Sequence, residues 1–213
     1  MSEHHTHCCG ETKNFDGLDP TYRRILWLVI AINAGMFALE TFAGHLANSQ
    51  ALQADALDFF ADALTYGLSL AVIGMPLRTR AKAALLKGVS LAFMGLWVFG
   101  STLYQTWVLQ TPQATVMGGM AILAFGANLV SVLLLMRYKD GDSNVRSVWL
   151  CSRNDMLGNV AVLVAALGVF GTGTAWPDLL VAGLMAGLFL HSSSLILRQS
   201  IRELMSNERS SPL

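Results

Sequence analysis

Long apolar stretches separated by short polar segments dominate the chain between residues 20 and 200. A helix that crosses a membrane needs about 20 predominantly apolar residues. Six stretches meet this requirement, and we expect spans at roughly 23–43, 52–75, 84–108, 113–136, 148–170 and 177–197. The short segments between them contain Gly, Pro, Asn and Asp residues that are typical of turns. The pattern therefore predicts an all-α protein with six transmembrane helices.

The basic residues alternate with the predicted spans and predict the topology. The connections after the first, third and fifth spans contain no Lys or Arg. Thirteen of the fourteen Lys and Arg residues would lie on the other side of the membrane: Lys13, Arg23, Arg24, Arg78, Arg80, Lys82, Lys87, Arg137, Lys139, Arg146, Arg198, Arg202 and Arg209. Cytoplasmic loops of membrane proteins carry the excess of positive charge. We therefore expect both the N- and C-termini in the cytoplasm.

The composition agrees with a membrane protein. Hydrophobic residues make up 54% of the chain and charged residues 13%, against about 25% charged residues in soluble domains. Segment 25–39 has too little polar surface for a helix of a soluble bundle. The first twenty residues have no apolar region like that of a cleavable secretory signal. The first helix is therefore expected to direct the chain to the cell membrane, and no nucleic-acid partner is expected.

Two pairs of ionisable side chains interrupt the second and fifth spans. Asp58 and Asp62 are four residues apart, as are Cys151 and Asp155. Residues four apart lie on the same face of a helix, so each pair can direct two donors at one ion. With a rise of 1.5 Å per residue, both pairs fall near the middle of the membrane. If the two helices face each other, the four donors can form one tetrahedral site.

The chemistry of these donors favours a soft or borderline divalent cation. Carboxylates and a thiolate in tetrahedral geometry suit Zn²⁺, and the sulfur also accepts Cd²⁺. Mg²⁺ and Ca²⁺ prefer shells of six or more oxygens. The alternatives are a hydrogen-bonded packing motif for the carboxyl groups and a small buried apolar residue for Cys151. Ionisable groups are costly inside a membrane, which favours a pathway for charged species.

Other polar residues within the spans are candidates for supporting roles. Asp55 lies one turn from Asp58, where it can relay protons, stage the exit of the ion or orient a neighbouring helix through a hydrogen bond. Glu40 and Asn33 share one face of the first span. With Asn159 of the fifth span, they are expected to make polar contacts that support the ligands.

The amino-terminal segment contains a second group of metal ligands. Five soft or borderline donors lie within six residues: His4, His5, His7, Cys8 and Cys9. Such a group can bind cytoplasmic Zn²⁺ or Cd²⁺ and deliver it to the membrane domain; the alternative is an inessential tail. We predict a disordered tail at 1–20, the membrane domain at 21–200 and a short cytoplasmic tail at 201–213.

Several of these motifs together resemble the transmembrane domain of the cation diffusion facilitator family, over about residues 20–205. They are Asn33, Glu40 and Gly44, the segment SQALQADALDFFADAL (49–64), and the segment NVRSVWLCSRNDMLGNVAVLVAAL (144–167). In that family the second and fifth spans each carry an H/D-x-x-x-D pair, and the two pairs form the transport site. The matching positions here are Asp58, Asp62, Cys151 and Asp155. Zinc-specific members typically have histidine at the first position of one or both pairs, where this chain has Asp58 and Cys151.

The resemblance also bears on assembly. Most relatives continue into a cytoplasmic ferredoxin-like domain, whereas this sequence ends about fifteen residues after its last span, so we expect no such domain. We expect a homodimer that forms through the helices or the amino-terminal segment. The small residues Gly183 and Gly187 offer a packing face in the last span, either for a dimer or within the monomer.

The resemblance implies export of a cytoplasmic divalent cation, Zn²⁺ first and Cd²⁺ second, in exchange for protons. The expected partners are metal ions, protons and the lipid bilayer, with no cofactor beyond the transported cation. Clustered acidic donors repel one another when ionised, which favours protonation of the empty site, and metal binding must then displace protons. A membrane metal sensor or receptor and a metal-dependent intramembrane enzyme remain alternatives. The sequence has no H-E-x-x-H motif, so we expect a secondary active transporter and not an enzyme.

Overall fold

The computed structural model of the chain describes residues 19–72, 75–108, 110–138 and 143–209, without the side chains of 77, 143–151 and 206–209. This part of the chain forms helices and contains no strand. The helices are α1 (Pro20–Ala47), α2 (Gln50–Ala71), α3 (Leu77–Val108), α4 (Ala114–Leu135), the short 3-10 helix η1 (Met136–Tyr138), α5 (Ser143–Thr172) and α6 (Trp176–Arg209). The prediction of an all-α protein is confirmed.

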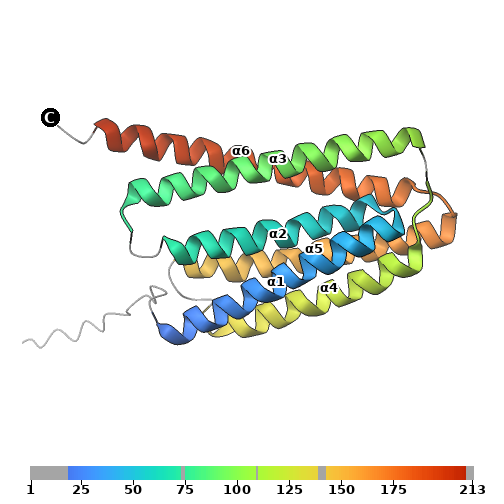
Figure 1. Cartoon of the computed structure of the whole chain (residues 1–213), viewed down its shortest axis with the longest axis horizontal. Helices are drawn as coiled ribbons and strands as arrows, with labels where there is room; N and C mark the ends of the chain where they lie inside the picture. Colours follow the sequence, from blue (N-terminus) through green and yellow to red (C-terminus); the bar gives the residue numbers. More distant parts are fainter. Residues whose placement is uncertain (1–18, 73–74, 109, 139–142, 210–213) are drawn as a thin grey trace, which may run out of the picture.

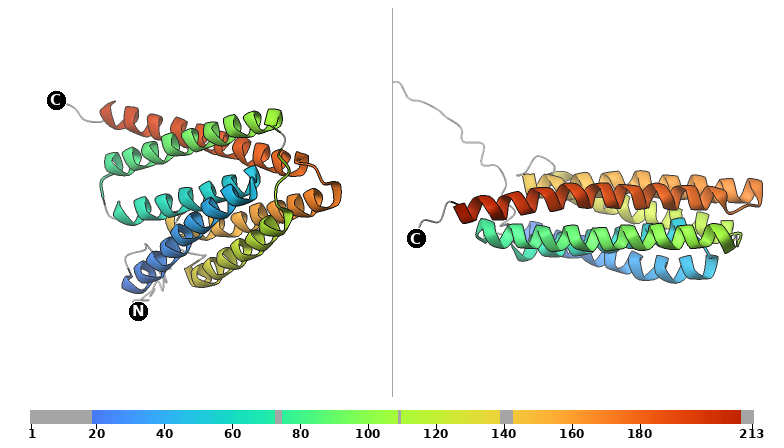
Figure 2. Two further views of the ribbon diagram at one scale, coloured as in Figure 1. Left: turned by 45° about the vertical axis from the view of Figure 1, so that its right-hand side comes forward. Right: turned by 90° about the horizontal axis from the view of Figure 1, so that it is seen from above.

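The long helices form two groups that lie side by side. Helices α1, α2, α4 and α5 pack into one bundle, and α3 pairs with α6 along its flank (Figures 1 and 2). Helix α2 is central, because it contacts each of the other five long helices. A helix in this position can expose little of its own surface to lipid.

Five of the described helices, α1, α3, α4, α5 and α6, are long and apolar enough to cross a membrane. Many of their large apolar side chains are exposed, among them Trp107, Phe170 and Leu184, as expected for a surface in contact with lipid. Helix α2 has 22 residues and is long enough to cross a membrane. It is not among these five helices, because it carries three aspartates. Asp55 and Asp62 of α2 are buried against neighbouring helices. The chain is therefore a multi-pass membrane protein in which α2 lies among five apolar helices.

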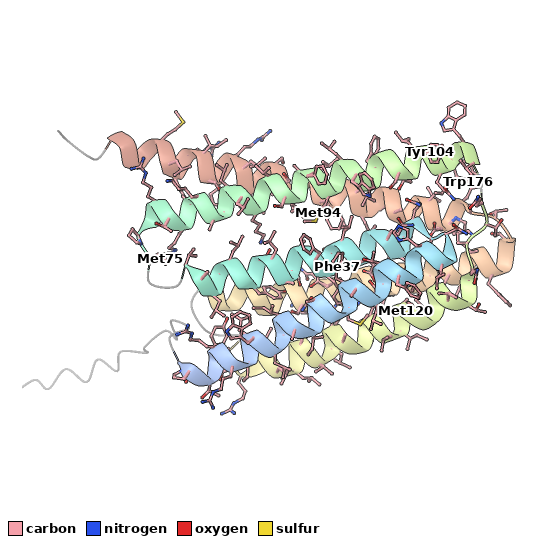
Figure 3. All side chains as sticks on the ribbon, viewed as in Figure 1. Phe37, Met75, Met94, Tyr104, Met120 and Trp176 are labelled. Carbon is pink, nitrogen blue, oxygen red and sulfur yellow. The ribbon has the colours of Figure 1, made fainter. Side chains whose placement is uncertain are left out.

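The connections alternate between the two ends of the bundle. The turns after α1, α3 and α5 lie at one end, and the start of α1 and the end of α6 lie at the other (Figure 1). Figure 3 shows Trp176 at the first end and Met75 at the second. The second end carries the exposed basic side chains of Arg23, Arg24, Arg78, Arg80, Lys82, Arg137, Arg198 and Arg202. By the positive-inside rule, this is the cytoplasmic end, and the first is the outer end.

A tight turn joins α1 to α2 at the outer end. Asn48 adopts a left-handed conformation with φ of 52°, and the hydroxyl of Ser49 accepts a hydrogen bond from the Leu52 N–H at 3.0 Å. The two helices approach closely at Gly44, where a Cβ would lie 2.9 Å from Cγ and 3.2 Å from the backbone N of Gln53. Glycine is therefore required at this position for the observed approach of α1 to α2.

Several helices, among them α3 and α6, extend beyond the predicted membrane spans. Helix α3 begins at Leu77, before the span predicted at 84–108, and α6 continues past the span predicted at 177–197 as far as Arg209. Within this extension, the Gln199 amide donates a 2.9 Å hydrogen bond to the Glu203 carboxylate one turn later. The apolar pattern locates the membrane and not the end of the helix, because polar residues such as Arg, Lys, Gln and Glu are good helix formers in water.

Small residues allow α3 and α6 to pack closely. A Cβ at Gly88 or Gly95 would lie 2.9 Å from the side chains of Leu197 and Leu190, and the Ser193 hydroxyl of α6 donates a 2.8 Å hydrogen bond to the Gly88 carbonyl. The other small-residue pair lies elsewhere. A Cβ at Gly183 or Gly187 would have no atom of another helix within 4 Å. In the described part of the chain, these two glycines therefore do not mediate packing within the monomer.

Candidate metal-transport site

Helices α2 and α5 bring three of the four predicted ligands together. The carboxyl groups of Asp58 and Asp62 both lie beside the Asp155 carboxyl group. Asp62 is buried, and Asp58 and Asp155 are half-buried. The described side chains contain no group of three or more His, Cys, Asp or Glu whose donors already converge as metal ligands do. The three carboxyl groups are thus adjacent.

The remaining predicted ligands lie outside the described residues. Cys151 belongs to α5, one turn before Asp155, but its side chain is not among those that the structure describes. The same holds for the amino-terminal donors His4, His5, His7, Cys8 and Cys9. Their roles as metal ligands stay predictions.

Tyr66 is a site residue that sequence reasoning missed. Its hydroxyl donates a 2.5 Å hydrogen bond to Oδ2 of Asp62 and lies 3.2 Å from the Ser152 hydroxyl of α5. Tyr66 and Ser152 are fully buried. The sequence did carry a signal for this contact. Tyr66 lies four residues after Asp62, on the same face of α2. The phenol links the two helices and orients the Asp62 carboxyl group.

A second pair of acidic side chains lies between the site and the outer end. Glu40 of α1 is fully buried beside Asp55 of α2, and neither carboxyl oxygen of Glu40 makes a hydrogen bond of standard geometry. Oδ1 of Asp55 lies next to the backbone of Gly158 in α5, 3.9 Å from the position of a Cβ there. The acidic side chains therefore continue from Asp58 through Asp55 to Glu40.

The two asparagines expected to support the ligands make no hydrogen bond to Asp58, Asp62 or Asp155, the predicted ligands whose side chains are described. The Asn33 amide donates a 2.8 Å hydrogen bond to the Val29 carbonyl within α1, and its Oδ1 has no partner. Asn159 lies one turn beyond Asp155, and neither of its amide atoms has a hydrogen-bond partner. Both side chains are buried. Both amide groups lie inside the bundle. Each can bind a water molecule, or a ligand side chain that adopts a second conformation.

Comparison with known proteins gives a consistent picture. The sequence profile described as "Cation efflux transmembrane domain" matches residues 26–205. The chain is 27% identical over 194 residues to the metal cation efflux system protein CzcD of Cupriavidus metallidurans. The aligned region covers 85% of this chain and 61% of CzcD. It is 25% identical over 218 residues to the zinc transporter ZitB of Escherichia coli, with 96% of this chain and 68% of ZitB covered.

A third relative is named for the ions that it exchanges. It is the cadmium, cobalt and zinc/H(+)-K(+) antiporter of Bacillus velezensis, 24% identical over 223 residues, with 96% of this chain and 67% of that protein covered. The chain thus spans about two thirds of the length of these relatives or less. The profile match includes most of every helix and all three adjacent carboxyl groups. The chain therefore belongs to the cation diffusion facilitators, the cation efflux family that its motifs predicted.

Proposed function

We propose that the chain exports a divalent transition-metal cation, Zn²⁺ first and Cd²⁺ second, from the cytoplasm in exchange for protons. Asp58, Asp62, Cys151 and Asp155 hold the cation. The observation that carries this proposal is the meeting of Asp58 and Asp62 of α2 with Asp155 of α5 inside the membrane. The names of the relatives, which include metal cation efflux and zinc transport, support the same substrate class.

The closeness of the carboxyl groups supports the exchange for protons. Carboxylates that lie close together repel one another when ionised, so the empty site favours a bound proton. A divalent cation binds the deprotonated groups and displaces that proton. The same residues can thus hold protons or metal in turn. Four anionic donors would bind a dication too tightly for release, and we propose that at least one donor keeps a proton in the metal-loaded site.

The metal preference follows from the donor set. A thiolate from Cys151 with three carboxyl groups makes a mixed sulfur and oxygen set, which favours Zn²⁺ and Cd²⁺ over Mn²⁺. Histidine, the ligand that zinc-specific family members typically use, is absent from these four positions. The sulfur donor therefore decides the selectivity in this chain.

The decisive experiment measures transport by the purified chain in proteoliposomes. Zn²⁺, Cd²⁺ and Mn²⁺ uptake is recorded with and without an imposed pH gradient, and a K⁺ gradient is tested separately because one relative is named for it. We expect Zn²⁺ flux that requires the pH gradient. Either Asp62→Ala or Asp155→Ala should abolish this flux. Ser200→Ala, which removes a hydrogen bond to the Ile196 carbonyl within α6, is the matched control and retains flux. Metal binding without movement in the unaltered chain would favour a sensor and contradict the proposal.

Two further parts of the proposal concern metal capture and assembly. We propose that His4, His5, His7, Cys8 and Cys9 capture cytoplasmic metal, so that deleting residues 2–9 raises the KM for Zn²⁺ without lowering the maximal rate.

We also propose a homodimer, for which the open face of α6 at Gly183 and Gly187 is available. Cysteine cross-linking at Gly187, with Gly100 of α3 as a control position that is also open, tests that face.

A further inference from the structure

Helix α2, which carries the transport-site aspartates, is capped by a residue of α6. Oδ2 of Asp178 accepts a 2.8 Å hydrogen bond from the Gln50 N–H, and Oδ1 accepts one of 3.1 Å from the Ala51 N–H. The Ser49 hydroxyl donates a further 2.6 Å bond to Oδ1. Asp178 lies in the first turn of α6, 128 positions beyond Gln50 in the sequence. One carboxyl group therefore joins the beginnings of two helices at the outer end.

The cap is inaccessible to water. Asp178 and Ser49 are both 0% exposed. The first N–H groups of a helix have no partner within the helix, and a buried N–H group without a partner is costly. A negatively charged group at this end is also favoured by the helix dipole. No water molecule can readily replace the Asp178 carboxyl group at this buried position.

Ser49 alone provides the usual cap for α2. Its hydroxyl accepts the hydrogen bond from the Leu52 N–H at 3.0 Å, the contact that an N-cap serine ordinarily makes. The contacts of Asp178 are additional to this local cap. Their distinctive effect is to attach α2 to α6, which belongs to the other group of helices (Figure 1).

The position of this attachment relates it to the transport site. Asp58 and Asp62 lie eight and twelve residues after Gln50, which corresponds to about 12 and 18 Å along the helix axis. A helix is stiff over this length, so a shift of its first turn shifts both carboxyl groups relative to Asp155 on α5. The attachment at the outer end therefore sets the depth at which α2 presents its ligands.

We infer that Asp178 is a positioning residue for the transport site, which acts by fixing the start of α2 to α6. It does not contact the metal. It holds Asp58 and Asp62 in register with Asp155, and it links the α3–α6 pair to the helix that carries the ligands. This inference rests on the proposed function, because it assigns Asp178 a role in metal binding.

The test compares three variants of the full chain in nanodiscs. Asp178→Asn replaces one acceptor oxygen by an NH₂ donor that faces N–H groups of α2. Ser49→Ala is milder, since it removes the serine hydroxyl and leaves the Asp178 bonds to α2 in place. Ser193→Ala is the matched control, because it removes a buried hydrogen bond from α6 to α3 instead of to α2.

Two measurements separate a positioning role from a merely structural one. Hydrogen exchange at the first turn of α2 reports the attachment, and calorimetric titration with Zn²⁺ reports the site. We expect Asp178→Asn to speed exchange at residues 50 and 51, whose N–H groups bind Asp178, and to weaken Zn²⁺ binding about 10-fold, as loss of a residue that orients metal ligands does. Ser49→Ala has a smaller effect in the same direction, and Ser193→Ala leaves both unchanged.

Each contrary result has a defined meaning. Faster exchange with unchanged Zn²⁺ affinity would show that the cap is only structural and would overturn the inference. An equal loss of Zn²⁺ affinity in Ser193→Ala would also overturn the inference, because any loosening of α6 would then be enough to weaken Zn²⁺ binding. If Asp178→Asn does not fold, Asp178→Glu, which keeps the charge and displaces the carboxyl group from the Gln50 and Ala51 N–H groups, decides by the same two measurements. Failure of the unaltered chain to bind Zn²⁺ would overturn the proposed function, and with it this inference.

Discussion

The hydroxyl of Tyr66 donates a 2.5 Å hydrogen bond to Oδ2 of Asp62, one of the predicted metal ligands. The same hydroxyl lies 3.2 Å from the Ser152 hydroxyl on α5. A single phenol therefore fixes the orientation of one ligand and connects the two helices that carry the site. Residues that orient a ligand in this way commonly contribute 10- to 100-fold to metal affinity.

Tyr66→Phe tests this relationship. The substitution keeps the buried ring, which packs with Leu70 and Leu135, and removes only the hydroxyl. We expect the KM for Zn²⁺ transport to rise about 10-fold, with the yield of folded protein unchanged. Tyr22→Phe, at another fully buried tyrosine of the same apolar cluster, is the control and leaves the KM unchanged. An equal rise in both variants would argue that Tyr66 acts through packing alone.

Cys151→Ser tests the source of the metal preference. Oxygen is a harder donor than sulfur, so the serine site should lose more affinity for Cd²⁺ than for Zn²⁺. We expect the ratio of Cd²⁺ to Zn²⁺ uptake in proteoliposomes to fall about 10-fold, the effect of a difference near 1.4 kcal/mol between the two metals. Equal losses for both metals would remove the selectivity argument and leave the transport proposal intact.

Metal binding should release protons and weaken as the pH falls. Asp58, Asp62 and Asp155 lie close together and repel one another when ionised, which favours protons in the empty site, and a bound cation displaces them. Lower pH favours the protonated site, so the apparent Zn²⁺ affinity decreases with decreasing pH. Calorimetry in buffers of different ionisation enthalpy counts the protons released for each Zn²⁺ bound. Release of no protons would exclude direct competition at this site.

Gly44→Ala tests the close approach of α1 and α2. The added Cβ would lie 2.9 Å from the Gln53 side chain and 3.2 Å from its backbone N, so the two helices must separate. Overpacking of this kind costs about 1–3 kcal/mol. We expect a lower Tm in detergent, measured by differential scanning fluorimetry. Gly100→Ala, at an open position of α3, is the control; a similar loss there would argue against a specific contact at Gly44.

The sequence was sufficient to predict which segments are helical and to propose which residues carry the chemistry. Apolar stretches long enough to cross a membrane predict the helices, because length and composition are local properties. The spacing of Asp58 and Asp62, and of Cys151 and Asp155, predicts donors on a common face, because the period of the helix is fixed. The apolar stretches mark the membrane spans and not the helix ends, since α3 and α6 extend past them.

Only the tertiary structure decided which faces meet. In a membrane protein, the positions that face lipid and those that face other helices are both apolar, so the sequence pattern does not identify the partner of a helix. The meeting of Tyr66 with Ser152, the placement of Glu40 beside Asp55 and the capping of α2 by Asp178 all join residues of different helices. These contacts depend on how the helices pack against each other, and local periodicity carries no information about that packing.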